Sequence, residues 1–294
     1  MARSPAHKFG QIIGDLVEAA VEPLLCKFAR EHSLYLDKKG PRAARAGRKV
    51  SWVDAYGNVH DLDYVLEKGG TAAAIGVPVA FIETAWRRYT KHSQNKAQEM
   101  QGAILPLVDK HRHAAPFVGA ILAGTFTEGA IAQLKSLGFT VLYFHYESIV
   151  SAFGSRRVDA YFDENTADAE FSKRVRAWAR LSEAQHRAVA RRLVEINSEE
   201  VEGFLSALAA TVNRQVESIR ILPLHGSPSE WKSVVAAIGF VESYQDQPCP
   251  KPVIRYEIRV VYNNGDYVEG QFADKESAIH FLRGYEQPSV RSST

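Results

Sequence analysis

The chain has 294 residues, of which 46% are hydrophobic and 24% charged, with a formal net charge of +2. This is the composition of an ordinary globular protein, and the length suits one large domain or a domain with an appendage. Cys26 and Cys249 stand far apart, which argues against a disulfide framework or a zinc site of paired cysteines. No apolar run reaches the length of a signal peptide or a membrane span, so we expect no membrane partner and a reduced, cytoplasmic location.

The first half of the chain alternates helical and strand patterns. Apolar residues recur at helical spacing over residues 9–31, and a turn signal at residues 56–58 joins two strand patterns into a hairpin. Residues 117–124 form a continuous apolar run, as in buried parallel strands. The predicted elements are a helix at 9–31, strands at 49–54, 59–66 and 77–85, a helix at 93–111, a strand at 117–124, a helix at 127–138 and a strand at 140–144. This order predicts an α/β fold with a mixed β-sheet flanked by helices on both faces.

The second half has a different character, starting near residue 163. The predicted helices lie at residues 170–181, 182–196, 199–217 and 231–239, and a proline-rich linker follows at 248–252. Beyond the linker, two alternating strands at 254–262 and 267–272 flank an Asn-Asn-Gly-Asp turn, and a helix at 273–285 completes a ββα unit. We therefore divide the chain into a core of residues 1–160 and a helical plus ββα region of residues 161–294.

Two of the predicted strands each carry a carboxylate within an apolar run. Asp63 lies in the second arm of the hairpin, and Glu83 lies in the strand at 77–85. Burial of a carboxylate is costly unless a partner replaces its hydration, and a divalent cation is a common partner. If the two strands are neighbours, Asp63 and Glu83 can hold one Mg²⁺ ion, which would neutralise charge on a phosphate and activate a water molecule. The alternative is that such acids occupy exposed strand ends, and we favour this alternative for Asp61.

Cations gather in two segments close to these carboxylates. Arginine and lysine donors suit phosphate groups, and the aromatic residues of the second segment, Trp86 and Tyr89, could pack on a sugar or a base. The alternatives are a solvated loop for the first segment and core positions for the two aromatic residues. The candidate DNA-binding residues are Arg42, Arg45, Arg48 and Lys49 in the first segment and Arg87 and Arg88 in the second.

The order of helix, hairpin with Asp63, strand with Glu83, helix and strand resembles the PD-(D/E)XK nuclease superfamily over roughly residues 9–147. The resemblance implies a restriction endonuclease-like core in which Asp63 and Glu83 are the metal-binding and catalytic carboxylates. It also offers Glu18 as the acidic residue that many members carry on the first helix, and the alternative is that Glu18 is an ordinary exposed helix residue. One departure is clear, because Ala85 stands where the superfamily places a lysine.

Another cation must replace the missing lysine if the site is catalytic. Lys96 shares a stripe with the apolar residues of the predicted helix at 93–111, so it points towards the sheet. A lysine in that position needs a negative partner, and the carboxylate pair supplies one. We place Lys96 ahead of Lys91 as the catalytic replacement, with Arg87 as a third candidate. The alternative is that the aliphatic stem of Lys96 merely covers the sheet edge.

The resemblance implies a Mg²⁺-dependent endonuclease that hydrolyses DNA phosphodiester bonds. Its simplest form is a type II restriction enzyme of a restriction-modification system, acting as a homodimer on double-stranded DNA, with the C-terminal region serving sequence recognition or dimerisation. Two other interpretations stay open: a non-catalytic DNA-binding protein on a decayed nuclease fold, which Ala85 motivates, or a nuclease of DNA repair or of RNA. The chain contains no GxxxxGK[ST], GxSxG or post-strand GxGxxG motif, which argues against nucleotide-hydrolysing, lipase-like and dinucleotide-binding proteins.

Overall fold

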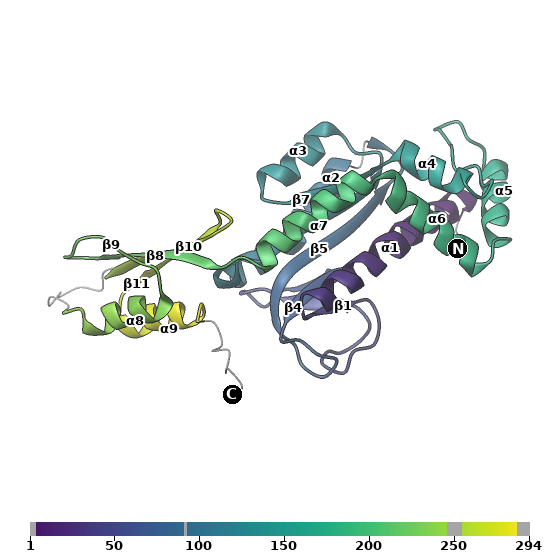
Figure 1. Ribbon diagram of the computed structural model, residues 1–294. Coiled ribbons are helices and arrows are strands. Elements are labelled where there is room, and N and C mark those ends of the chain that lie inside the picture. Colours follow the sequence, from purple (N-terminus) through teal and green to yellow (C-terminus); the bar gives the residue numbers. More distant parts are fainter. Residues whose placement is uncertain (1–3, 91–92, 246–254, 287–294) are drawn as a thin grey trace. The chain divides into compact units, whose positions relative to one another are not determined.

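The computed structural model of the chain, drawn in Figure 1, describes residues 4–90, 93–245 and 255–286. The chain forms two compact units, the first made of Met1–His111 and Pro116–Val212 and the second of Arg112–Ala115 and Asn213–Thr294. The boundary between the main units therefore lies near residue 212 and not at residue 160, where we predicted it. The helices between these positions belong to the first unit because their apolar side chains, such as Phe171 and Leu193, join the same core as the N-terminal helix.

The first unit is built on a five-stranded sheet with the order β1-β4-β5-β6-β7. β1, β4 and β5 run antiparallel and β5, β6 and β7 run parallel, which confirms the predicted α/β fold with a mixed sheet. The strands of this unit are β1 (Leu34–Lys38), β2 (Val50–Val53), β3 (Val59–Leu62), β4 (Tyr64–Lys68), β5 (Val77–Arg87), β6 (Phe117–Gly124) and β7 (Thr140–His145). Its helices are α1 (Pro5–Glu31), α2 (Ser93–Lys110), α3 (Glu128–Ser136), α4 (Tyr146–Gly154), α5 (Asp168–Ala179), α6 (Glu183–Ile196) and α7 (Ser198–Val212).

Helices cover both faces of this sheet. Successive side chains of a strand point to opposite faces, so Ile82 of β5 packs in the core with α1 while its neighbour Phe81 packs in the core with α2. α1 and α4 to α7 contribute to the first core, and α2 and α3 contribute to the second (Figure 1). β6 is buried along its whole length, as its continuous apolar run predicted. Among the described helices, none is long and apolar enough to cross a membrane.

The predicted strand at residues 59–66 is interrupted at Asp63, where the chain bends. β3 ends at Leu62 and pairs with β2 in a separate two-stranded hairpin, whereas β4 begins at Tyr64 and lies between β1 and β5 in the main sheet. One face of the hairpin is buried, since Val50 and Trp52 pack in the same core as α2. The bend leaves Asp63 between the β2–β3 ladder and the β4–β5 ladder, and Asp63 is paired in neither of them.

The second unit consists of two successive ββα segments around its own core. Its elements are β8 (Val216–Pro223), β9 (Ser229–Trp231), α8 (Val234–Ser243), β10 (Tyr256–Tyr262), β11 (Tyr267–Phe272) and α9 (Lys275–Arg283), with a short 3₁₀ helix at Arg112–Ala114. The strand order is β11-β10-β8-β9, so the first strands of the two segments are neighbours at the centre of the sheet. Each helix begins after a capping side chain that accepts a backbone hydrogen bond, Ser233 for α8 and Asp274 for α9.

Only the second of these ββα segments was predicted. The helix predicted at 199–217 ends at Val212, and β8 follows, because alternating residues such as Ile219 and Ile221 fill the core of the second unit. The linker predicted at 248–252 and Cys249 within it lie outside the described residues.

Candidate functional site

A notch opens where β5 extends beyond its neighbour β4. The first residue of β4, Tyr64, is paired with Ile82, yet β5 continues to Arg87. On its other side β5 stays paired with β6 along this stretch, as far as the pair of Arg87 and Gly124. A cavity of about 200 Å³ lies at the notch, with walls from α1, β5 and the first turn of α2. The residues that line it are Gly14, Val17, Glu18, Asp63, Glu83, Thr84, Ala85, Trp86 and Lys96.

The structure brings Asp63 and Glu83 together at this notch, as expected for neighbouring strands. The backbone N–H of Asp63 donates to Glu83 Oε1 at 3.2 Å. In return, Asp63 Oδ2 accepts two hydrogen bonds from Thr84, one from the backbone N–H at 2.8 Å and one from the hydroxyl at 2.7 Å. These bonds fix one oxygen of each carboxylate in position. Thr84 was missed by the sequence reasoning, because its role depends on the bend at Asp63.

Burial and mutual repulsion dominate the electrostatics of the pair. Burial, followed by the nearby charge of Asp63, raises the pKa of Glu83 to about 8, although Lys96 acts in the opposite direction. Burial, and next the charge of Asp63, also raises the pKa of Glu18 on α1. Three carboxyl groups therefore line one small cavity with Lys96 as the cation among its lining residues. This is the environment that a bound divalent cation would relieve, so the residues fit a magnesium ion.

The candidate metal ligands do not form a complete set of protein ligands around one point. Within the described ranges, no group of three or more His, Cys, Asp or Glu side chains is placed to hold a metal ion. Mg²⁺ commonly uses only one or two protein carboxylates and keeps several waters or substrate oxygens. Asp63 and Glu83 suffice for this mode of binding, and Glu18 is the third carboxylate within the same cavity.

Lys96 lies in the cavity and thus where a replacement for the motif lysine is needed. Its side chain is only 14% exposed, and its Nζ donates to Glu99 Oε1 at 2.8 Å. Arg87 Nη2 lies 3.8 Å from Oε2 of the same glutamate, and Arg87 also donates to the carbonyl of Trp86. Arg87 is not among the residues that line the cavity. Lys91, the other candidate, lies outside the described residues. Of the described candidates, Lys96 is therefore the cation next to the carboxylates.

The structure places two of the candidate DNA-binding arginines in the interior. The side chain of Arg42 is 2% exposed and binds Glu67 Oε1 at 2.5 Å and Asp37 Oδ2 at 2.9 Å. Arg45 pairs with Asp37 at 3.1 Å and is also buried at its side chain. Both arginines hold the loop that joins β1 to β2 against the sheet, which removes them from the surface that a phosphate could reach.

The remaining candidate DNA-binding residues differ in accessibility. Arg48 and Lys49 are exposed, and Lys49 forms an ion pair with Asp61 at 2.5 Å, which leaves Asp61 at the surface as expected. Arg88 instead lies over the ring of Phe171, at 4.5 Å from its centroid, and donates to a backbone carbonyl. Its predicted contact with phosphate is therefore replaced by cation–π contacts with the core.

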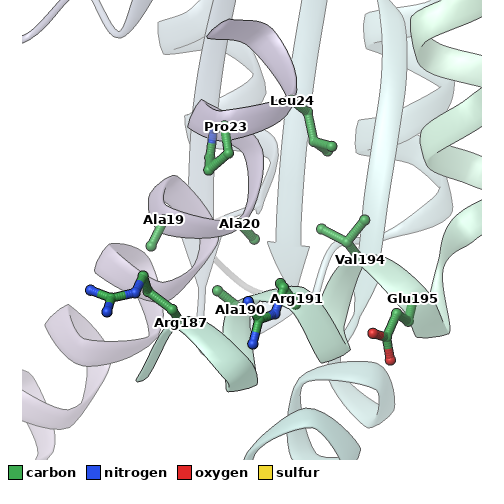
Figure 2. A pocket seen from close by; sticks show the side chains of 9 residues that line it. All are labelled: Ala19, Ala20, Pro23, Leu24, Arg187, Ala190, Arg191, Val194 and Glu195. Atoms are coloured by element: carbon green, nitrogen blue, oxygen red, sulfur yellow. The ribbon is translucent and has the colours of Figure 1, made fainter. Parts of the chain in front are cut away.

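A larger cavity of about 430 Å³ lies between α1 and α6 in the same unit. Figure 2 shows small side chains, among them Ala20 and Ala190, between the two helices. Its lining is mainly apolar, with charged side chains at Arg187, Arg191 and Glu195. Of its lining residues only Glu195 is a carboxylate, whereas Glu18, Asp63 and Glu83 line the smaller cavity.

Comparison with known proteins identifies no family. No family model matches the chain, and no curated protein matches it. A crystal structure described as a protein of unknown function, AF1548, is similar with a TM-score of 0.29 and 13% identity, over 67% of this chain and 98% of that one. A TM-score this low supports neither a shared fold nor a shared function.

Proposed function

We propose that the first unit is a Mg²⁺-dependent nuclease of the PD-(D/E)XK type that hydrolyses phosphodiester bonds in DNA, most simply as a type II restriction endonuclease. The observation that carries the proposal is the hydrogen-bonded pair of Asp63 and Glu83 beside Lys96 at the end of the β4–β5 ladder. The mixed sheet with antiparallel strands followed by parallel ones supports the same assignment. Two buried carboxylates and a lysine in one cavity are the groups that metal-assisted hydrolysis of a phosphate needs.

Each residue of the site has a defined task in this proposal. Asp63 and Glu83 would hold the metal, and their hydrogen bonds to each other and to Thr84 fix their positions. A magnesium ion bound there supplies Lewis acidity towards the phosphate and lowers the pKa of a coordinated water. Lys96 donates to the attacking water or to a phosphate oxygen, and Thr84 fixes the orientation of Asp63.

A second candidate function is DNA binding without cleavage. Ala85 at the motif position and the hydrogen bond that ties Lys96 to Glu99 both favour it, since a tied lysine is less available to a substrate. In that case the carboxylates would bind a cation that only bridges the protein to a phosphate.

Plasmid cleavage with and without Mg²⁺ separates these functions. We expect the wild type to nick or linearise DNA only with the metal, and we expect Glu83→Gln and Asp63→Asn to lose that activity. Glu202→Gln makes the same charge change at an exposed position of α7 and serves as the control. Full activity of Glu83→Gln would refute the site, whereas DNA retention in a gel shift with no cleavage would favour the second candidate.

A further inference from the structure

The hairpin of β2 and β3 has one anchored face and one free face. Val50, Trp52 and Leu62 are buried against the core that includes α2. On the opposite face Val53 and Val59 are direct cross-strand partners, and Val59 is 64% exposed. The turn between them presents Tyr56, whose exposed fraction is 85%. Three apolar side chains thus gather at the tip of a hairpin that is fixed from behind.

The turn that carries Tyr56 is rigid. Asp54 Oδ1 accepts the backbone N–H groups of Tyr56 at 2.8 Å and Asn58 at 2.9 Å, while Asp54 Oδ2 accepts the side chain of Asn58 at 2.9 Å. His60 Nε2 lies 3.0 Å from Asp54 Oδ2. Asp54 itself is 4% exposed, whereas its partners Tyr56 and Asn58 are exposed. Because the backbone of the turn is held in place, little backbone entropy is lost when the turn binds a partner.

Exposed cations lie at both ends of this hairpin. Lys110, at the end of α2, donates to the carbonyl of Val53 at 2.6 Å and is exposed. Lys49 and Arg48 lie at the open end of β2 and are exposed, and Asp61 is the acid that accompanies them on β3. An exposed aromatic ring at the tip, with one cation beside it and two at the far end of the hairpin, complements a polyanion that lies along the hairpin and whose bases can stack.

We propose that the tip of the β2–β3 hairpin binds a nucleic-acid strand, with Tyr56 stacked on an unpaired base and with Lys49 and Lys110 contacting phosphates. The inference rests on the proposed nuclease function and specifies its substrate as a strand with an unstacked base near the cleaved bond. β3 leads directly into Asp63, four residues beyond Val59. At roughly 3.3 Å per residue the stretch from Val59 to Asp63 spans about 13 Å, or about four steps of a nucleic-acid strand, and Tyr56 lies beyond Val59 in the turn.

The test measures binding in the Glu83→Gln background, which separates binding from cleavage. The probe is a fluorescein-labelled single-stranded oligonucleotide that contains 2-aminopurine, whose fluorescence reports stacking. We expect Tyr56→Ala to weaken binding roughly 5- to 100-fold and to abolish the fluorescence change, whereas Tyr56→Phe retains both. Tyr161→Ala is the matched control, because Tyr161 is also an exposed tyrosine of the first unit.

The outcomes distinguish this inference from the function on which it rests. Wild-type affinity and an unchanged 2-aminopurine signal in Tyr56→Ala would overturn the stacking contact while Mg²⁺-dependent cleavage still stands. Equal losses in Tyr56→Ala and Tyr56→Phe would also overturn it, since the phenyl ring stacks as well as the phenol. Absence of both DNA binding and cleavage in the wild type would reject the proposed function itself.

Discussion

Replacement of Glu83 by Gln should make the metal-free protein more stable at alkaline pH. Glu83 is 8% exposed, and burial together with the charge of Asp63 raises its pKa from 4.5 to about 8. Gln keeps the side-chain oxygen that accepts the Asp63 backbone N–H, but it has no proton to lose. The variant therefore removes the ionisation of residue 83 and preserves its hydrogen bond.

The sign of this pH dependence follows from the number of protons that the folded and the unfolded protein bind. Between about pH 4.5 and pH 8 the folded protein keeps the Glu83 proton that the unfolded chain releases, so the free energy of unfolding falls as the pH rises. The slope is at most about 1.4 kcal/mol per pH unit, and the penalty is complete above the folded pKa. Allowing for relaxation around the buried group, we expect a total loss of roughly 2 to 5 kcal/mol over this window.

This loss can be measured by urea denaturation in EDTA at about pH 5 and pH 8.5. At each pH, the free energy of unfolding of Glu83→Gln is subtracted from that of the wild type, and the change in this difference between the two pH values is the loss. Comparison of the two proteins cancels the titration of other groups, and Glu202→Gln controls for the general loss of one acid. A difference that does not vary with pH would refute the buried, proton-binding state of Glu83. Mg²⁺ at the higher pH should restore more stability to the wild type than to Glu83→Gln, because the variant lacks one of the two carboxylates that would hold the ion.

Other predictions concern the neighbouring charges. Arg42→Ala should lower the free energy of unfolding by about 3 to 5 kcal/mol in urea, because it strands buried carboxylates, whereas the exposed Arg48→Ala should change it by less than about 0.5 kcal/mol. Lys96→Ala should reduce cleavage by about 100-fold or more and raise the pKa of Glu83 further, a shift that a pH titration of Mg²⁺ affinity would detect. EDTA should abolish cleavage, and Mg²⁺ should restore it, as measured on plasmid DNA; activity that persists in EDTA would exclude a metal-dependent reaction.

Most strands of the main sheet could be predicted because their sequence patterns are local. The apolar runs of β6 and of β5 around Phe81 and Ile82 depend only on neighbours in the sequence. β1 at Leu34–Lys38 was missed, since its pattern of residues is short and mixed and its pairing with β4 is decided by tertiary contacts. The first ββα segment was missed for a related reason, because a charged helical pattern runs directly into β8.

The role of the basic loop could not be read from its composition. Arg42 follows glycine and proline in a segment rich in cations, which is the usual pattern of a solvated surface. Its partner Glu67 lies 25 residues away on β4, so their buried ion pair depends on the tertiary fold. The alternating strand pattern hid this partner, because a glutamate at a strand end looks exposed until the cation that neutralises it is known.

Some features of the candidate site could be predicted from local sequence patterns, and others depend on the tertiary fold. The carboxylates of Asp63 and Glu83 could be found because acids within apolar strands are rare, and Lys96 could be found from helical periodicity. The bend at Asp63 could not, and it is the bend that turns one Asp63 oxygen onto the backbone and hydroxyl of Thr84. Without the bend, a strand continuing past Tyr64 would pair with β5 and cover the notch in which these groups meet. The interruption of the strand therefore opens the cavity beside the two carboxylates, where the proposed substrate would bind. A continuous strand with the same residues would have filled this space.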